Sequence, residues 1–152
     1  METAAFLTRD REPIVAAAAS AIVRAHIRHY ESAGPEELER RLEELFDHVL
    51  EAVTTHDLGS MIRHAEVVAE ERFNGGYDLS EVQTAFNALE ESVWSHALAE
   101  LEPSQLAETL GLVSTVLGAG KDALARRYVS LAAGTHAPSL DLRTLFAGSG
   151  GA

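Results

Sequence analysis

Apolar side chains recur at helical spacing along most of the chain, and four breaks divide this pattern into five segments. The expected helices run from about residue 10 to 32, and then over residues 35–53, 58–73, 79–101 and 103–133. Residues 1–9 are expected to be a loose lead-in, and no segment has the alternation of a strand. The pattern predicts an all-α fold, either a five-helix bundle or a globin-like helical domain over residues 1–134. A short, flexible C-terminal tail, residues 135–152, follows.

The junction between the third and fourth helices carries the strongest local signals. Gly75 and Gly76 are expected to end the third helix, because glycine adopts left-handed backbone without a steric penalty. Asp78 or Ser80 is the candidate N-cap of the next helix, and Gln83 has the capping-box spacing from Ser80. An amphipathic stripe then follows, formed by Val82, Phe86, Leu89 and Val93 and widened by Ala85 and Trp94.

The fifth helix also carries a line of small residues: Gly111, Ser114, Gly118 and Ala125. Glycine inside a helix costs about 1 kcal/mol relative to alanine, so a close approach of another helix is the natural compensation. Two interpretations stay open. The line permits tight packing within the monomer, or it forms the seam of a dimer.

The tail contains one apolar motif among glycine, serine and proline residues. Leu142, Leu145 and Phe146 are spaced i, i+3 and i+4, so a single helical turn would present them on one side. Three interpretations fit this motif: the tail docks on its own helical domain, it is disordered, or it is a docking peptide for a partner protein.

Charge and composition exclude several classes of partner. Twelve basic and 24 acidic residues give a net charge of −12, which disfavours binding to nucleic acid. Glutamates on the second helix, with Arg40 and Arg41 interleaved, are interpreted as a solvated face. The chain has no cysteine, no signal-peptide pattern at its start and no apolar run of membrane-spanning length. We therefore expect a cytoplasmic protein that does not bind membranes.

No catalytic motif is present, so the chain is expected not to be an enzyme, and no cofactor is predicted. Seven histidines keep one alternative open, a haem- or metal-binding helical protein with His26, His64 or His96 as ligand. None of these three follows a glutamate at the spacing found in carboxylate-bridged iron sites. His48 and His56 are expected to face solvent.

One group of residues around the glycine turn resembles a known family. An arginine is followed by Gly-aromatic-x-Leu-x-Glu-Val and then by an aromatic residue and a leucine. The residues are Arg72, Gly76, Tyr77, Leu79, Glu81, Val82, Phe86 and Leu89. This pattern resembles the N-terminal domain of RsbRD-type RsbT co-antagonist proteins, and the resemblance extends over about residues 13–132.

The resemblance implies an all-helical regulatory domain related in architecture to globins that lack haem. Such domains serve bacterial stress and signalling proteins as input or protein-interaction modules, are often dimeric, and offer no catalytic residues. The family pattern usually continues into a second domain, whereas this chain ends in a tail, so a free-standing sensor or adaptor is expected. We expect a non-enzymatic regulatory domain that acts through a protein partner and forms a homodimer.

Overall fold

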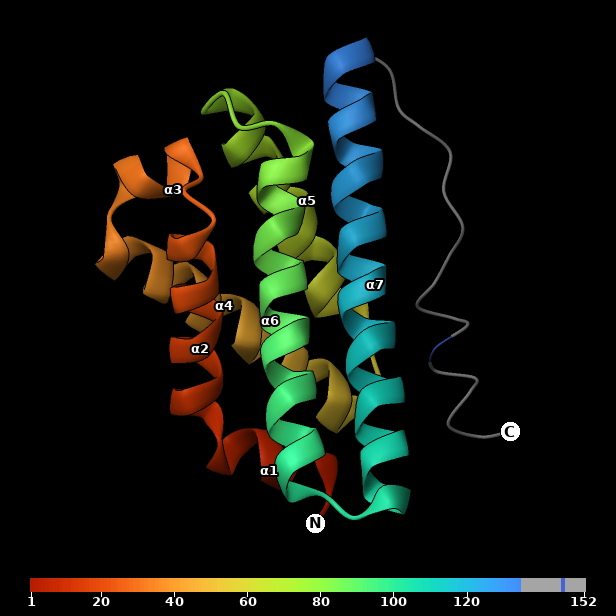
Figure 1. Cartoon of the computed structure of the whole chain (residues 1–152). Coiled ribbons are helices and arrows are strands. Elements are labelled where there is room, and N and C mark those ends of the chain that lie inside the picture. The colour runs from red at the N-terminus through yellow and green to blue at the C-terminus, as the bar shows by residue number, and fades with distance from the viewer. Residues whose placement is uncertain (135–145, 147–152) are drawn as a thin grey trace.

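The structure, a computed structural model, describes residues 1–134 and Phe146, and this part of the chain contains helices and no strand (Figure 1). Its helices are α1 (Thr3–Arg9), α2 (Arg11–Arg24), α3 (Arg28–Ala33), α4 (Pro35–Thr55), α5 (Gly59–Asn74), α6 (Leu79–Glu100) and α7 (Pro103–Ala133). The all-α prediction is confirmed. No described helix is both long and apolar enough to cross a membrane.

The predicted count of five helices is wrong, and both differences lie before α4. Residues 3–9 form α1 instead of a loose lead-in, because Phe6 and Leu7 are fully buried in the core. The expected first helix is divided into α2 and α3 at His26, which has a left-handed backbone with φ of 52°. The break redirects the chain so that α3 approaches the α5–α6 turn.

The long helices pack around one apolar core. Helices α2, α6 and α7 lie side by side, with α4 and α5 behind them in the view of Figure 1. The most extensive contacts join α5 to α7 and α2 to α6. The largest fully buried side chains come from six of the helices and the α4–α5 link: Phe6, Leu7, Ile14, Ile22, Leu38, Leu42, Phe46, Leu58, Met61, Leu89, Leu117 and Leu124.

The α5–α6 turn forms where the sequence predicts it, and one of the two predicted caps is used. Gly76 has φ of 83°, in the region that favours glycine, and the chain then enters α6. Of the two candidates, Asp78 and Ser80, Asp78 is the N-cap. It forms a capping box with Glu81, whose carboxylate accepts the Asp78 backbone N–H at 3.0 Å.

Close packing on α7 occurs at Gly120, outside the predicted line of small residues. A Cβ atom at Gly120 would lie 2.8 Å from Cε2 of Phe86 and 3.0 Å from Sδ of Met61. A Cβ atom at Gly111 or Gly118 would have no neighbouring atom within 4 Å beyond its chain neighbours and the nearby backbone of its own helix. These two glycines are therefore not explained by tight packing inside the monomer.

Phe146 is the only residue of the apolar tail motif that the structure describes. Its side chain is buried, and its ring stacks on His56 with 5.8 Å between centroids. Leu142 and Leu145 lie outside the described residues.

We predict opposite effects for alanine at two glycines of α7. Gly120→Ala should destabilise the fold by about 1–3 kcal/mol, because the new methyl group overpacks Phe86 and Met61. The control Gly111→Ala, which faces open space, should stabilise it by up to about 1 kcal/mol through helix propensity. Urea unfolding measures both. Equal effects of the two substitutions would contradict this packing.

Candidate functional site

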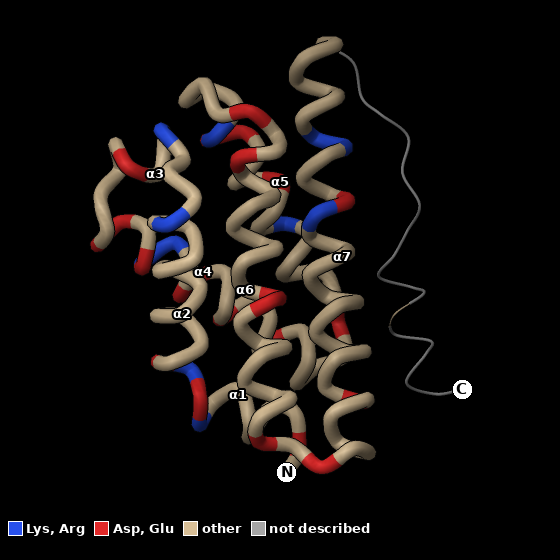
Figure 2. Tube along the Cα trace, viewed as in Figure 1, with Lys and Arg blue, Asp and Glu red and all other residues tan. Residues whose placement is uncertain are grey.

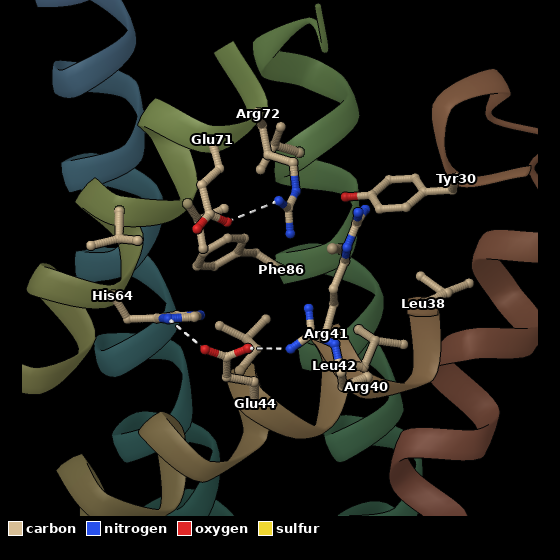
Figure 3. A pocket seen from close by; sticks show the side chains of 15 residues that line it. Tyr30, Leu38, Arg40, Arg41, Leu42, Glu44, His64, Glu71, Arg72 and Phe86 are labelled. Carbon is tan, nitrogen blue, oxygen red and sulfur yellow. Dashed lines mark hydrogen bonds and ion pairs between the residues drawn. The ribbon is translucent and has the colours of Figure 1, made fainter. Parts of the chain in front are cut away.

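A cavity of about 180 Å³ lies between α4, α5 and α6, with Tyr30 of α3 at its edge. Figure 3 shows side chains from these helices facing a common space. The floor is apolar and includes Leu42, Val68 and Phe86. The polar wall consists of Tyr30, Arg40, Arg41, Glu44, His64, Glu71 and Arg72. A small molecule with one polar end and one apolar end matches this division.

Two guanidinium groups dominate the polar wall. Arg72 comes from the last turn of α5, and its side chain is only 12% exposed. Among the described residues its one ion-pair partner is Glu71, at 3.2 Å, and that carboxylate is 61% exposed. Arg41, from α4, bonds to Glu37 at 3.1 Å and donates to the hydroxyl of Tyr77 at 2.9 Å. The cavity therefore has a positively charged wall, and some of the N–H donors of these two arginines make no hydrogen bond to another described residue.

Tyr77 holds this wall in place. Its ring lies under both guanidinium groups, with 5.8 Å from Arg41 and 5.7 Å from Arg72 to the ring centroid. The same ring stacks on His29 at 4.4 Å and meets Tyr30 edge-on at 5.7 Å. The hydroxyl of Tyr128 donates to the Tyr77 carbonyl at 3.1 Å. One residue thus fixes α3, α4, α5 and α7 at the start of α6.

The phenol of Tyr30 supplies a neutral polar group to the cavity. Burial raises the pKa of Tyr30 to about 12, and the nearby Arg72 only partly opposes this effect. The hydroxyl therefore stays protonated at neutral pH and is available as a hydrogen-bond donor.

His64 lies on the opposite side of the cavity and stacks on His48. His48 of α4 and His64 of α5 stack with 4.2 Å between ring centroids. The His64 side chain is 10% exposed, and its Nδ1 lies 3.8 Å from the Glu44 carboxylate. Burial, with the neighbouring His48, lowers the pKa of His64 to about 4 despite the opposing charge of Glu44. The His64 ring is neutral at pH 7.

The structure brings most of the family-like motif to this site. Arg72, Val82 and Phe86 line the cavity, and Tyr77 supports it. Glu81 caps α6 and accepts from Nδ1 of His29 at 2.7 Å, while Gly76 forms the turn. Leu79 and Leu89 pack in the core or against it.

The other predicted sets are dispersed. Of the three histidines considered as ligands, only His64 faces the cavity, since His26 is exposed and His96 bonds to the Ser92 carbonyl. Arg41 and His48 were predicted to face solvent, yet both are partly buried here. In the sequence, only their position at the edge of the apolar stripe of α4 indicated this partial burial.

Fold and cavity together define an all-helical domain with a partly open cavity beside the α5–α6 glycine turn. The chain belongs to the family described as the RsbT co-antagonist protein rsbRD N-terminal domain, whose sequence profile matches residues 13–139. This confirms the resemblance noted in the sequence. No curated protein and no solved structure matches the chain.

We predict that His64 makes stability fall in mild acid. The pKa of His64 drops from 6.5 to about 4 on folding. The contribution of this residue to the free energy of unfolding is therefore complete above pH 6.5. It is lost as pH falls towards 4, since the unfolded chain then binds a proton that the folded ring rejects. At pH 5 the loss should be about 1–2 kcal/mol after allowance for solvent screening.

The measurement is urea unfolding of wild type and His64→Gln at pH 7.5 and pH 5, with a chelator present. The variant should lose less stability than wild type on acidification. Identical losses in both proteins would contradict the assignment to His64.

Proposed function

We propose that this chain is a cytoplasmic, non-enzymatic regulatory domain of bacterial stress signalling that senses a small anionic molecule. Membership of the rsbRD N-terminal family supports the regulatory role. The family is named for co-antagonists of RsbT, so an RsbT-type protein is the proposed partner. The domain would act by binding and by a change in helix packing.

The observation that carries the sensing role is the pair of partly buried guanidinium groups at the cavity. Arg72 and Arg41 face it from two different helices, and the hydroxyl of Tyr30 lies beside them (Figure 3). Guanidinium groups bind carboxylates through paired, charge-assisted hydrogen bonds. The chain as a whole is acidic, and Figure 2 shows most basic positions in the half of the molecule that holds α3 and the α5–α6 turn.

The size of the cavity narrows the ligand class. A volume of about 180 Å³ equals roughly six water molecules at liquid density, which suits a small ligand. A small monocarboxylate with an apolar body satisfies both the size and the two-sided lining. The cavity lies below the roughly 300–1,000 Å³ of sites for larger ligands, which disfavours the haem alternative.

Ligand binding would reach the rest of the domain through the helices that form the cavity. A carboxylate between Arg41 and Arg72 draws α4 and the end of α5 together, and both arginines rest on the ring of Tyr77. Any change there acts on the start of α6. This is the proposed route from the signal to the outer face of α6 and α7.

That outer face has the features of a contact surface. Trp94 and Leu98 of α6 are 45% and 58% exposed and line an open groove that also includes Lys121 of α7. The line of small residues on α7 borders the groove, since Ser114 donates to Glu90 at 2.9 Å. Gly111 and Gly118 leave open space beside it. We place the homodimer seam here, with Gly111, Ser114, Gly118 and Ala125 on one side.

We predict that benzoate, a probe of the proposed class, binds the chain in a saturable way. Arg72→Gln should weaken binding at least about tenfold, because it removes a charge-assisted hydrogen bond. The matched control is Arg127→Gln, an arginine of α7 that pairs with Glu70 and does not line the cavity. Isothermal titration calorimetry measures all three affinities.

A failure of benzoate and shorter or longer carboxylates to bind would contradict the sensing role. Equal weakening by Arg72→Gln and Arg127→Gln would contradict the site.

We predict a dimer with twice the 16.4-kDa chain mass in light scattering coupled to size-exclusion chromatography. Leu98→Glu should shift it to monomer by placing a charge in the seam. Val23→Glu, at a similarly exposed position on α2, is the control and should remain dimeric. A wild-type monomer at high concentration would rule out the seam.

A further inference from the structure

Next to the arginine wall lies a second group of side chains that the proposed sensing role does not use. Glu44, His48 and His64 each offer one ligand atom, and these atoms all lie within 4.8 Å of one another. Glu44 and His48 are four residues apart on α4, so they share one helix face. His64 approaches from α5, beyond the turn that joins the two helices.

His48 has a fixed tautomer that frees one nitrogen. Its Nδ1 lies 2.6 Å from the hydroxyl of Ser60, and that hydroxyl donates to the Glu51 carboxylate at 2.7 Å. Since the hydroxyl proton is used on Glu51, the Ser60 oxygen accepts from Nδ1–H of His48. Nε2 therefore carries the lone pair. A hydrogen-bonded outer group that orients a histidine in this way is typical of metal sites.

His64 contributes a ring that is 10% exposed and comes from the other helix. Its ring makes no hydrogen bond to any other described residue. The Glu44 carboxylate at 3.8 Å is beyond hydrogen-bond distance. No buried side-chain nitrogen of the described residues lacks a partner, so a His64 nitrogen without a hydrogen bond keeps some solvent access, and its lone pair is open to an ion.

Glu44 is free to complete the group. It pairs with Arg40 at 3.1 Å, but Arg40 also forms two hydrogen bonds to Glu37, at 3.0 and 2.6 Å. Releasing Glu44 therefore leaves Arg40 with a carboxylate partner. The Glu44 side chain is 48% exposed and can swing by the required distance.

We propose that Glu44, His48 and His64 bind a divalent transition-metal ion, for which Zn²⁺ is the best fit, and that the ion ties α4 to α5. Two imidazoles and one carboxylate match a common zinc ligand set with a fourth position left for water. Bond lengths of about 2.0–2.1 Å require ligand atoms about 3.3 Å apart in a tetrahedron. The two stacked rings must rotate so that their lone pairs converge.

This site is independent of the anion in the arginine cavity, although Glu44 and His64 also border that cavity. Loss of metal binding with benzoate binding retained would remove this inference alone. Loss of benzoate binding with metal binding retained would remove only the sensing role.

The test uses the full, tag-free chain, with Co²⁺ absorption as the probe of coordination and calorimetric titration with Zn²⁺. A saturable, one-to-one visible Co²⁺ spectrum that Zn²⁺ abolishes is expected. His48→Gln and His64→Gln should each weaken Zn²⁺ binding at least tenfold, and Ser60→Ala should weaken it about tenfold to a hundredfold through the lost orientation of His48. His96→Gln, a histidine of α6 outside the group, is the matched control and should leave the affinity unchanged.

Zinc should also stabilise the fold, which separates a built site from loose surface binding. At one hundred times the dissociation constant the unfolding midpoint should rise by about 5–10 °C in wild type and in His96→Gln. Circular dichroism without metal confirms that the variants fold. The proposal is overturned if the chain gives no saturable Co²⁺ spectrum, or if His48→Gln and His64→Gln bind Zn²⁺ as wild type does.

Discussion

The packing of Tyr77 is the contact on which the site depends. A tyrosine directly after a glycine turn could project into solvent, and here its ring is covered by His29, Tyr30 and two guanidinium groups. Its backbone carbonyl is bonded from α7 by Tyr128. Five helices therefore meet at one residue. A ring that attracts cations helps to hold both guanidinium groups beside the cavity.

This arrangement explains why the break at His26 matters. A continuous first helix would carry His29 and Tyr30 away in the direction of α2. The left-handed turn at His26 starts α3 on a new axis, and α3 then delivers both rings to Tyr77. The His29–Glu81 contact at 2.7 Å joins this corner to the capping box of α6. Local backbone geometry and long-range packing support the same junction.

A charged guanidinium group at low exposure carries an energetic cost, and that cost gives the cavity its chemical character. Arg72 is nearly buried, and its ion-pair partner is an exposed glutamate on the same helix. A ligand carboxylate would contribute the charge that the protein supplies only weakly. On the other side of the cavity, the His64 ring makes no hydrogen bond to another described residue, and the ligand proposed there is a metal ion. The two sites share a boundary and attract ions of opposite sign.

The sequence predicts the features that depend on short-range periodicity. The four longest helices, the glycine turn and the all-α class follow from stripe spacing and helix-stop residues, which act within a few positions. Helix α1 is missed because a seven-residue helix is too short to show a period, and its stability comes from burying Phe6 and Leu7. Asp78 and Ser80 have similar capping chemistry, and only the direction of the chain after Gly76 selects Asp78.

The site itself depends on contacts between distant segments, which composition does not encode. Gly111, Gly118 and Gly120 look alike in the sequence, but only Gly120 faces Phe86 and Met61. His48 and Arg41 lie beside an apolar stripe, where a rotation of the helix by a few tens of degrees decides between solvent and cavity. The motif around Arg72 was identifiable because its residues are close in sequence as well as in space.

The most direct test of the arginine cavity is nuclear magnetic resonance of the arginine side chains during titration with benzoate. If Arg41 and Arg72 together bind a carboxylate, their Nε–H resonances will shift with one common, saturating dissociation constant. The resonance of Arg127 will stay in place. Shifts that grow linearly without saturation, or that are equal at all three arginines, would contradict the central claim.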